Sequence, residues 1–109
     1  MEINIAENIK TVELLKVEIL QKVTDLFGDI SAEADGETYA RIADDAANLI
    51  NLIYIIASRL GVSYEDIEDR IREKLADGVR EQHIIERKFG DLSKLLAVLG
   101  EGPIGYEKY

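Results

Sequence analysis

The sequence predicts an all-α protein: a helical bundle built on two long antiparallel helices, with shorter helices toward the C-terminus. Apolar residues recur at spacings of three and four over residues 4–30 and again over residues 37–60. Only one proline occurs in 109 residues, and most of the eight glycines stand between the periodic segments. This pattern favours helices over strands, and the length is that of one domain.

The first predicted helix covers residues 4–30. Its apolar side chains keep a rhythm of four and three that only Lys16 interrupts: Ile5, Ile9, Val12, Ile19, Val23, Leu26 and Ile30. Its polar side places four ionisable residues on one face by spacings of four, three and four: Glu18, Lys22, Asp25 and Asp29. The break at residues 31–37 turns the chain back, with Asp35 as the expected N-cap of the next helix.

The second predicted helix covers residues 37–60 and is apolar on most of its faces. A helix of this kind has to be covered on all sides, so we expect it in the core of a bundle. Its N-terminal half carries a polar patch formed by Asp44, Asp45, Asn48 and Asn51. Acids and amides near a core are unfavourable unless another group pairs with them. Gly61 is the expected left-handed residue that ends this helix.

Shorter helices are predicted after Gly61. Ser63 is the expected N-cap of a helix with one apolar stripe and a charged opposite side, which should end at Gly78. Residues 79–89 predict a short helix that Gly90 breaks, and Asp91 begins a last helix with four leucines. We therefore expect one helical domain over residues 1–100 and a flexible tail over residues 101–109.

The composition excludes several functions. The formal net charge of −9, from 22 acids and 13 bases, argues against general binding to nucleic acid. Cysteine is absent, which excludes a disulfide, a thiolate metal site and a Cys nucleophile. The acidic N-terminus lacks the apolar stretch of a signal peptide, so we expect a cytoplasmic protein without membrane contact. His83, the only histidine, is expected at a helix surface or at the edge of the core.

The chain resembles the MazG-like proteins, the all-α nucleotide pyrophosphohydrolase superfamily. The resemblance lies in two long helices with acids at matched places and the run Arg59-Leu60-Gly61-Val62-Ser63 before an acidic helix. Residues 9–27, 48–61 and 83–96 carry it, and the segment Phe89-Gly90-Asp91-Leu92-Ser93 is among its most specific parts. The closest similarity is to a short MazG-like branch common in Firmicutes.

The resemblance implies a magnesium site between the two long helices. Active relatives bind the ions through E-x-x-E on one helix and E-x-x-D on the next, because hard carboxylate oxygens suit magnesium. Aligning this chain at Leu60-Gly61 places Lys22-x-x-Asp25 on the first motif and Asp45-x-x-Asn48 on the second. The expected ligands are therefore Asp25, Asp45 and Asn48, with Glu18 and Asp29 about one turn away.

The departure from four carboxylates predicts that the metal site is degenerate. A charged lysine cannot bind a metal ion, so we expect the Lys22 ammonium to replace the metal electrostatically. Lys74 and Arg80 are candidate phosphate ligands, although solvated charges with local ion pairs are the more ordinary interpretation.

The resulting hypothesis is a non-catalytic or weakly active helical module that binds nucleotide or acts by oligomerising. The alternative is a Mg²⁺-dependent nucleoside triphosphate pyrophosphohydrolase with a reduced set of carboxylates. The apolar surface of the second helix exceeds what one short chain covers, which predicts a homodimer or a higher homo-oligomer.

Overall fold

A computed structural model describes residues 5–100, which form helices without a strand. The helices are α1 (Ile5–Ser31), α2 (Thr38–Arg59), α3 (Tyr64–Arg80), α4 (Ile84–Phe89) and α5 (Asp91–Leu99), and they confirm the predicted all-α class. The expected tail at residues 101–109 lies outside the described residues. The chain divides into two compact units, one ending at Ser63 and the other beginning at Tyr64. A single domain over residues 1–100 stays a prediction.

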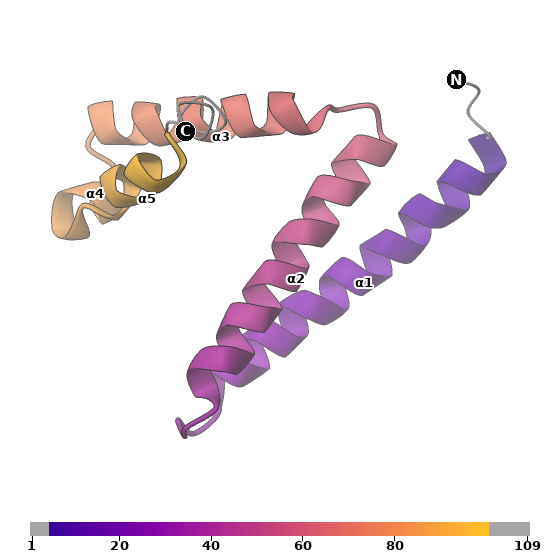
Figure 1. The fold of residues 1–109 in the computed structure, drawn as a ribbon, viewed down its shortest axis with the longest axis horizontal. Helices are drawn as coiled ribbons and strands as arrows, with labels where there is room; N and C mark the ends of the chain where they lie inside the picture. The colour runs from indigo at the N-terminus through magenta and orange to yellow at the C-terminus, as the bar shows by residue number, and fades with distance from the viewer. Residues whose placement is uncertain (1–4, 101–109) are drawn as a thin grey trace, which may run out of the picture. The chain divides into compact units, whose positions relative to one another are not determined.

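The first unit is the antiparallel pair α1 and α2, drawn in indigo to magenta in Figure 1. Leu15, at 7% exposure, is the one buried apolar side chain in the described residues. The other side chains of the contact, such as Ile19 on α1 and Leu49 on α2, are half-buried. The pair therefore buries only a narrow strip of its apolar surface.

The C-terminal end of α2 is fixed by a contact with α1 and by the residues that follow the helix. At its C-terminal end the Asn8 amide of α1 donates a hydrogen bond to the Arg59 carbonyl oxygen, at 3.0 Å. Gly61 follows with φ +96°, and its N–H donates to the Ser58 carbonyl oxygen at 3.0 Å. The Val62 N–H donates to the Ala57 carbonyl oxygen, also at 3.0 Å. This pair of bonds is a Schellman motif, which confirms the predicted role of Gly61.

The turn before α2 differs slightly from the prediction. The helix begins at Thr38, and Glu37 precedes it without a capping side chain. Asp35 still caps the turn, because its Oδ1 accepts the Glu37 N–H at 2.7 Å. In return the Thr38 hydroxyl accepts the Asp35 N–H at 2.8 Å. The two bonds close the turn ahead of the helix, so the predicted N-cap residue Asp35 acts two residues before the N-cap position.

The second unit contains α3, α4 and α5, and two predicted boundaries in it are wrong. The prediction ends α3 at Gly78, but the helix continues to Arg80. The short helix predicted over residues 79–89 begins only at Ile84. A Cβ atom on Gly78 would lie 2.6 Å from Leu92 Cδ1, so this glycine makes room for a leucine of α5. His83 is the N-cap of α4, where its Nδ1 accepts the Ile85 N–H at 3.1 Å.

A left-handed glycine and a glutamate join α4 to α5. Gly90 has φ +68° and separates the two helices, as predicted. The Glu86 carboxylate accepts the Ser93 N–H at 2.9 Å and also accepts a hydrogen bond from the Ser93 hydroxyl. The hydroxyl bond and then the backbone bond of Ser93 lower the pKa of Glu86. The segment from Phe89 to Ser93 thus contains the turn between the helices and also Ser93. The Glu86 carboxylate caps the start of α5 by binding this serine.

No single helix in the described part of the chain is long and apolar enough to cross a membrane. The segments α2 and α3, taken together across their break, do pass that test of length and composition.

The lowered pKa of Glu86 predicts how the stability of the second unit depends on pH. The folded pKa lies below the ordinary value of 4.5, so the cap stabilises the fold above about pH 4.5 and is lost as the pH falls through the folded value. Glu86→Gln should lower the Tm at pH 7 by a few degrees, as loss of a helix cap does, and the difference should shrink near pH 3. Thermal melts across this pH range measure both. An equal loss in the exposed control Glu81→Gln would contradict the assignment.

Candidate functional site

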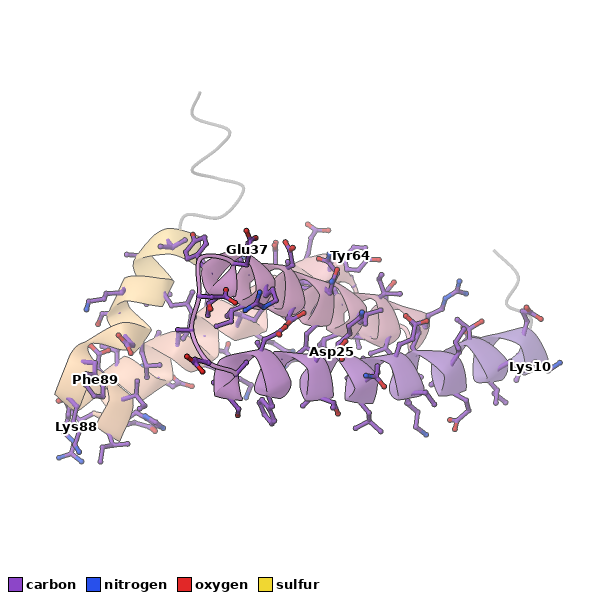
Figure 2. The ribbon with its side chains drawn as sticks, turned by 90° about the horizontal axis from the view of Figure 1, so that it is seen from below. Lys10, Asp25, Glu37, Tyr64, Lys88 and Phe89 are labelled. Atoms are coloured by element: carbon purple, nitrogen blue, oxygen red, sulfur yellow. The ribbon has the colours of Figure 1, made fainter. Side chains whose placement is uncertain are left out.

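The candidate site is a hollow of about 520 Å³ between α1 and α2, near the turn that joins them. Its lining carries four aspartates and one arginine: Asp25 and Asp29 from α1, and Arg41, Asp44 and Asp45 from α2, together with Thr24 and Gly28. Figure 2 shows Asp25 on the part of α1 that runs beside α2. The antiparallel pairing therefore brings acids of both predicted motifs to one place.

Two neighbours on α1 hold Asp25. The Lys22 ammonium lies 3.7 Å from Asp25 Oδ2, and the Gln21 amide donates to Asp25 Oδ1 at 2.9 Å. The side chains of Lys22 and Asp25 are 34% and 36% exposed, so water screens their attraction in part. The predicted partnership of Lys22 with Asp25 is thus present, at the rim of the hollow.

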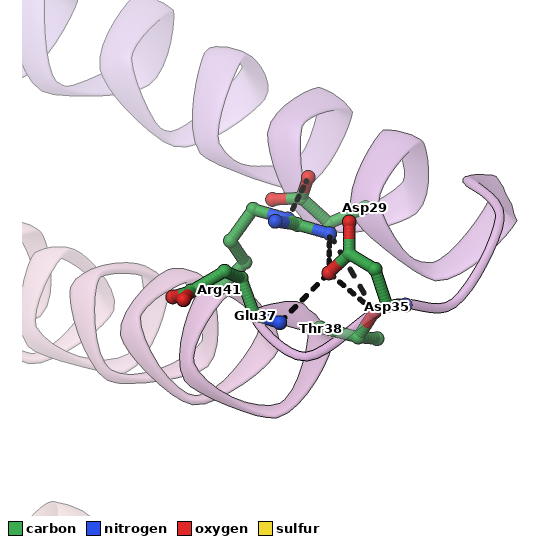
Figure 3. A network of polar contacts seen from close by, with 5 residues as sticks. All are labelled: Asp29, Asp35, Glu37, Thr38 and Arg41. Carbon is green, nitrogen blue, oxygen red and sulfur yellow. Dashed lines mark hydrogen bonds and ion pairs between the residues drawn. The ribbon is translucent and has the colours of Figure 1, made fainter.

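Arg41 is a second cation at the site, and it is not among the residues that the sequence predicts there. Its Nε lies 3.4 Å from Asp29 Oδ1, and its Nη2 lies 3.2 Å from Asp35 Oδ1 (Figure 3). Arg41 therefore links α1 to the turn before α2. The available signal was its place four residues before Asp45, on the same face of α2.

Asp45 is a poorly compensated carboxylate at the hollow. Its Oδ2 atom is inaccessible to water and has no hydrogen-bond partner. Two ionised carboxylates are both acceptors, so Asp45 and Asp29 can share a hydrogen bond only through a proton. That bond is the largest cause of a raised pKa of Asp45, and burial and the charges of Asp29 and Asp25 raise it further. The Lys22 ammonium opposes these effects.

The predicted residues fall into two groups. Asp25, Asp29 and Asp45 meet at the hollow, whereas Glu18 and Asn48 are exposed and do not line it. The candidate phosphate ligands, Lys74 and Arg80, lie on α3 in the second unit. Arg80 forms a local ion pair with Asp77, one helical turn earlier.

The acids at the hollow do not fit a resident magnesium ion. Magnesium requires near-octahedral oxygen ligands at short, regular distances. Within residues 5–100, no three side chains of His, Cys, Asp or Glu are placed to hold a metal ion. The cations Lys22 and Arg41 also lie against Asp25 and Asp29 already.

The raised pKa of Asp45 predicts a stabilising substitution. A carboxyl with a raised folded pKa favours folding below its ordinary value of 3.8, and this contribution is lost as the pH rises through the folded pKa. The charge of Asp45 therefore destabilises the folded protein at neutral pH. Asp45→Asn, which removes this charge, should raise the Tm at pH 7. The gain should shrink near pH 3, where the Asp45 carboxyl takes up its proton in the unfolded chain as well. Melts of both proteins at the two pH values, with Asp44→Asn as the control, measure this; a lower Tm at pH 7 would show that Asp45 needs its charge.

Comparison with known proteins adds one finding. The model of the MazG-like family matches residues 5–92, which is most of the chain. No curated protein and no solved structure is a significant match.

Proposed function

Because the chain belongs to the MazG-like family, we propose that it is a nucleotide pyrophosphohydrolase-like helical module with a degenerate metal site, non-catalytic or weakly active. One observation supports this proposal above the others. Two side-chain cations, Lys22 and Arg41, lie within 4 Å of the aspartates Asp25 and Asp29 at the hollow between the helices. The Firmicutes-type branch stays a prediction.

The side-chain cations perform the electrostatic part of a metal ion's role. Carboxylates brought together repel one another unless positive charge lies between them. Each ion pair is about one-third exposed, so its contribution is about 0.5–1 kcal/mol and not the ~3–5 kcal/mol lost when a buried pair is broken. The contribution is modest, but it is present without any bound ion.

The same cations cannot replace a metal ion in activating water for hydrolysis. A divalent metal lowers the pKa of a bound water and so supplies hydroxide at neutral pH. An ammonium or guanidinium group donates hydrogen bonds but does not bind water in this way. Arg41 can still donate to phosphate oxygens if it exchanges a carboxylate for them. Nucleotide binding without rapid hydrolysis is the behaviour that this site favours.

The charge at position 22 should decide whether Mg²⁺ raises the thermal stability of the protein. We expect Lys22→Ala to lower the free energy of unfolding by about 0.5–1 kcal/mol, which millimolar Mg²⁺ restores in part. Lys22→Glu should lose more stability without Mg²⁺ and gain a clear magnesium-dependent rise in Tm. The wild type should respond little. Thermal melts of the three proteins with and without millimolar Mg²⁺ measure these differences.

Lys10→Glu is the matched control, because Lys10 is exposed on α1 far from Asp25 (Figure 2). It makes the same change of charge away from the hollow and should leave the magnesium response unchanged. A wild type that melts much higher with Mg²⁺ would show a working metal site. A Lys22→Ala protein that melts like the wild type would show that Lys22 is only a solvated surface charge.

The alternative is a Mg²⁺-dependent nucleoside triphosphate pyrophosphohydrolase with a reduced carboxylate set. The unpartnered Oδ2 atom of Asp45, which faces Asp29 and Asp25 among the lining acids, favours it. A screen of nucleoside triphosphates with Mg²⁺ or Mn²⁺, monitored by release of pyrophosphate, tests this function. Turnover that Asp45→Asn abolishes while Asp44→Asn retains it would establish the alternative. Turnover that Asp45→Asn leaves unchanged would contradict a role of Asp45 in hydrolysis at this hollow.

A further inference from the structure

The corner between α3 and α4 is built on one histidine (Figure 1). The His83 N–H donates to the Gly78 carbonyl oxygen at 2.9 Å. The Gln82 N–H donates to the Val79 carbonyl oxygen at 3.2 Å, and the two bonds together form the Schellman motif that ends α3. The imidazole Nδ1 of the same histidine accepts the Ile85 N–H at 3.1 Å, which begins α4. His83 therefore closes one helix and opens the next.

The residue before His83 adopts a backbone conformation that is unfavourable for its type. Gln82 has φ +59°, and within residues 5–100 no other residue except glycine has a positive φ. A Schellman motif usually has glycine at this position, because a Cβ atom destabilises the left-handed region. The Gln82 amide donates to the Val79 carbonyl oxygen at 3.2 Å, and Arg87 Nε of α4 donates to the Gln82 carbonyl oxygen at 3.1 Å. The corner thus depends on side-chain hydrogen bonds to keep its shape.

The N-cap bond of His83 requires an Nδ1 atom without a proton. A neutral imidazole accepts a hydrogen bond at one ring nitrogen, whereas both nitrogens of the charged form are donors. Protonation therefore replaces the acceptor of the Ile85 N–H by a second donor. It also places a positive charge at the N-terminal end of a helix, which the helix dipole disfavours. Imidazole is the side chain that ordinarily changes its charge between about pH 5 and pH 8.

The neighbouring charges do not compensate a protonated His83. The Arg87 guanidinium, on the first turn of α4, is itself positive, and the Glu86 carboxylate is already bound to Ser93 of α5. In the described part of the chain, no carboxylate forms an ion pair with the imidazole. The other charged residues of the corner and of the two helices that follow it are Asp77 and Arg80, which pair with each other, and Glu81, Lys88, Asp91 and Lys94.

We propose that this corner is a pH-sensitive joint: neutral His83 holds the first turn of α4, and protonation in weak acid releases it. The stability that the cap contributes is present at high pH and is lost as the pH falls through the range in which imidazole takes up its proton. The Glu86 carboxylate loses its bonds to Ser93 only below about pH 4.5. The first turn of α4 therefore opens before the contact between α4 and α5 does. The proposal concerns the second unit and does not depend on the function of the hollow.

The amide of Ile85 reports the state of the joint directly. In the wild-type chain, its hydrogen exchange at pH 5.5 should be about five-fold or more faster than at pH 7.5, after correction for the intrinsic rate at each pH. Loss of an N-cap raises the population of the open state by about this factor. The Lys94 N–H, which donates to the Gly90 carbonyl oxygen at 3.1 Å in α5, should show no such change. NMR of the full chain measures both amides.

Three variants test the role of the imidazole. His83→Asn supplies an N-cap acceptor that does not titrate, so the exchange of the Ile85 amide should stay slow at both pH values. His83→Ala removes the acceptor and should give fast exchange at both. Gln82→Gly removes the strain of the left-handed residue, so it should slow the exchange and keep the pH dependence, and it carries the test even where His83→Ala fails to fold. Equal exchange of the wild type at the two pH values, or the same acceleration by acid in His83→Asn, would overturn the proposal.

Discussion

The close approach of α1 and α2 near their connecting turn depends on compensation of negative charge. Asp25, Asp29, Asp44 and Asp45 come from two helices and line one hollow, and carboxylates this close oppose the pairing of the helices. Lys22 compensates Asp25, and Arg41 compensates Asp29 while also holding Asp35 in the turn. Asp45 receives the least, which its raised pKa reflects. The charge balance of the hollow therefore depends on where these two cations lie.

The helices could be predicted from the sequence because periodicity reports which side chains share a face. Ile5 to Ser31 and Thr38 to Arg59 form helices within about one or two residues of the predicted ends. Glycine is a less reliable signal for the end of a helix, since it can either adopt a positive φ there or make room for a neighbouring side chain. Gly61 and Gly90 adopt positive φ and end helices, whereas Gly78 continues α3 and makes room for Leu92. Only the tertiary contact distinguishes these cases, and it joins residues 14 positions apart.

The candidate site was predictable in part. Acids at helical spacing on two antiparallel helices were expected to meet, and Asp25, Asp29 and Asp45 do line the same hollow. Arg41 was missed because its partners lie on another helix and in the turn, where spacing along one helix says nothing. Glu18 and Asn48 satisfied the spacing but lie outside the hollow, since each is one or two helical turns farther from the connecting turn than Asp25 or Asp45. Spacing therefore identified the face of each helix but not which of its residues contact the partner.

The exposed side chains of Leu20 on α1 and Ile50 on α2 lie on the opposite face of the helix pair from the acidic hollow, which gives the two faces separate tolerances to mutation. A substitution at Lys22 or Asp45 alters charge on one side and leaves Ile50 and Leu20 untouched, with few contacts through which the two effects could combine. Substitutions can thus change the charge of the hollow on one face while the apolar side chains on the other face stay the same.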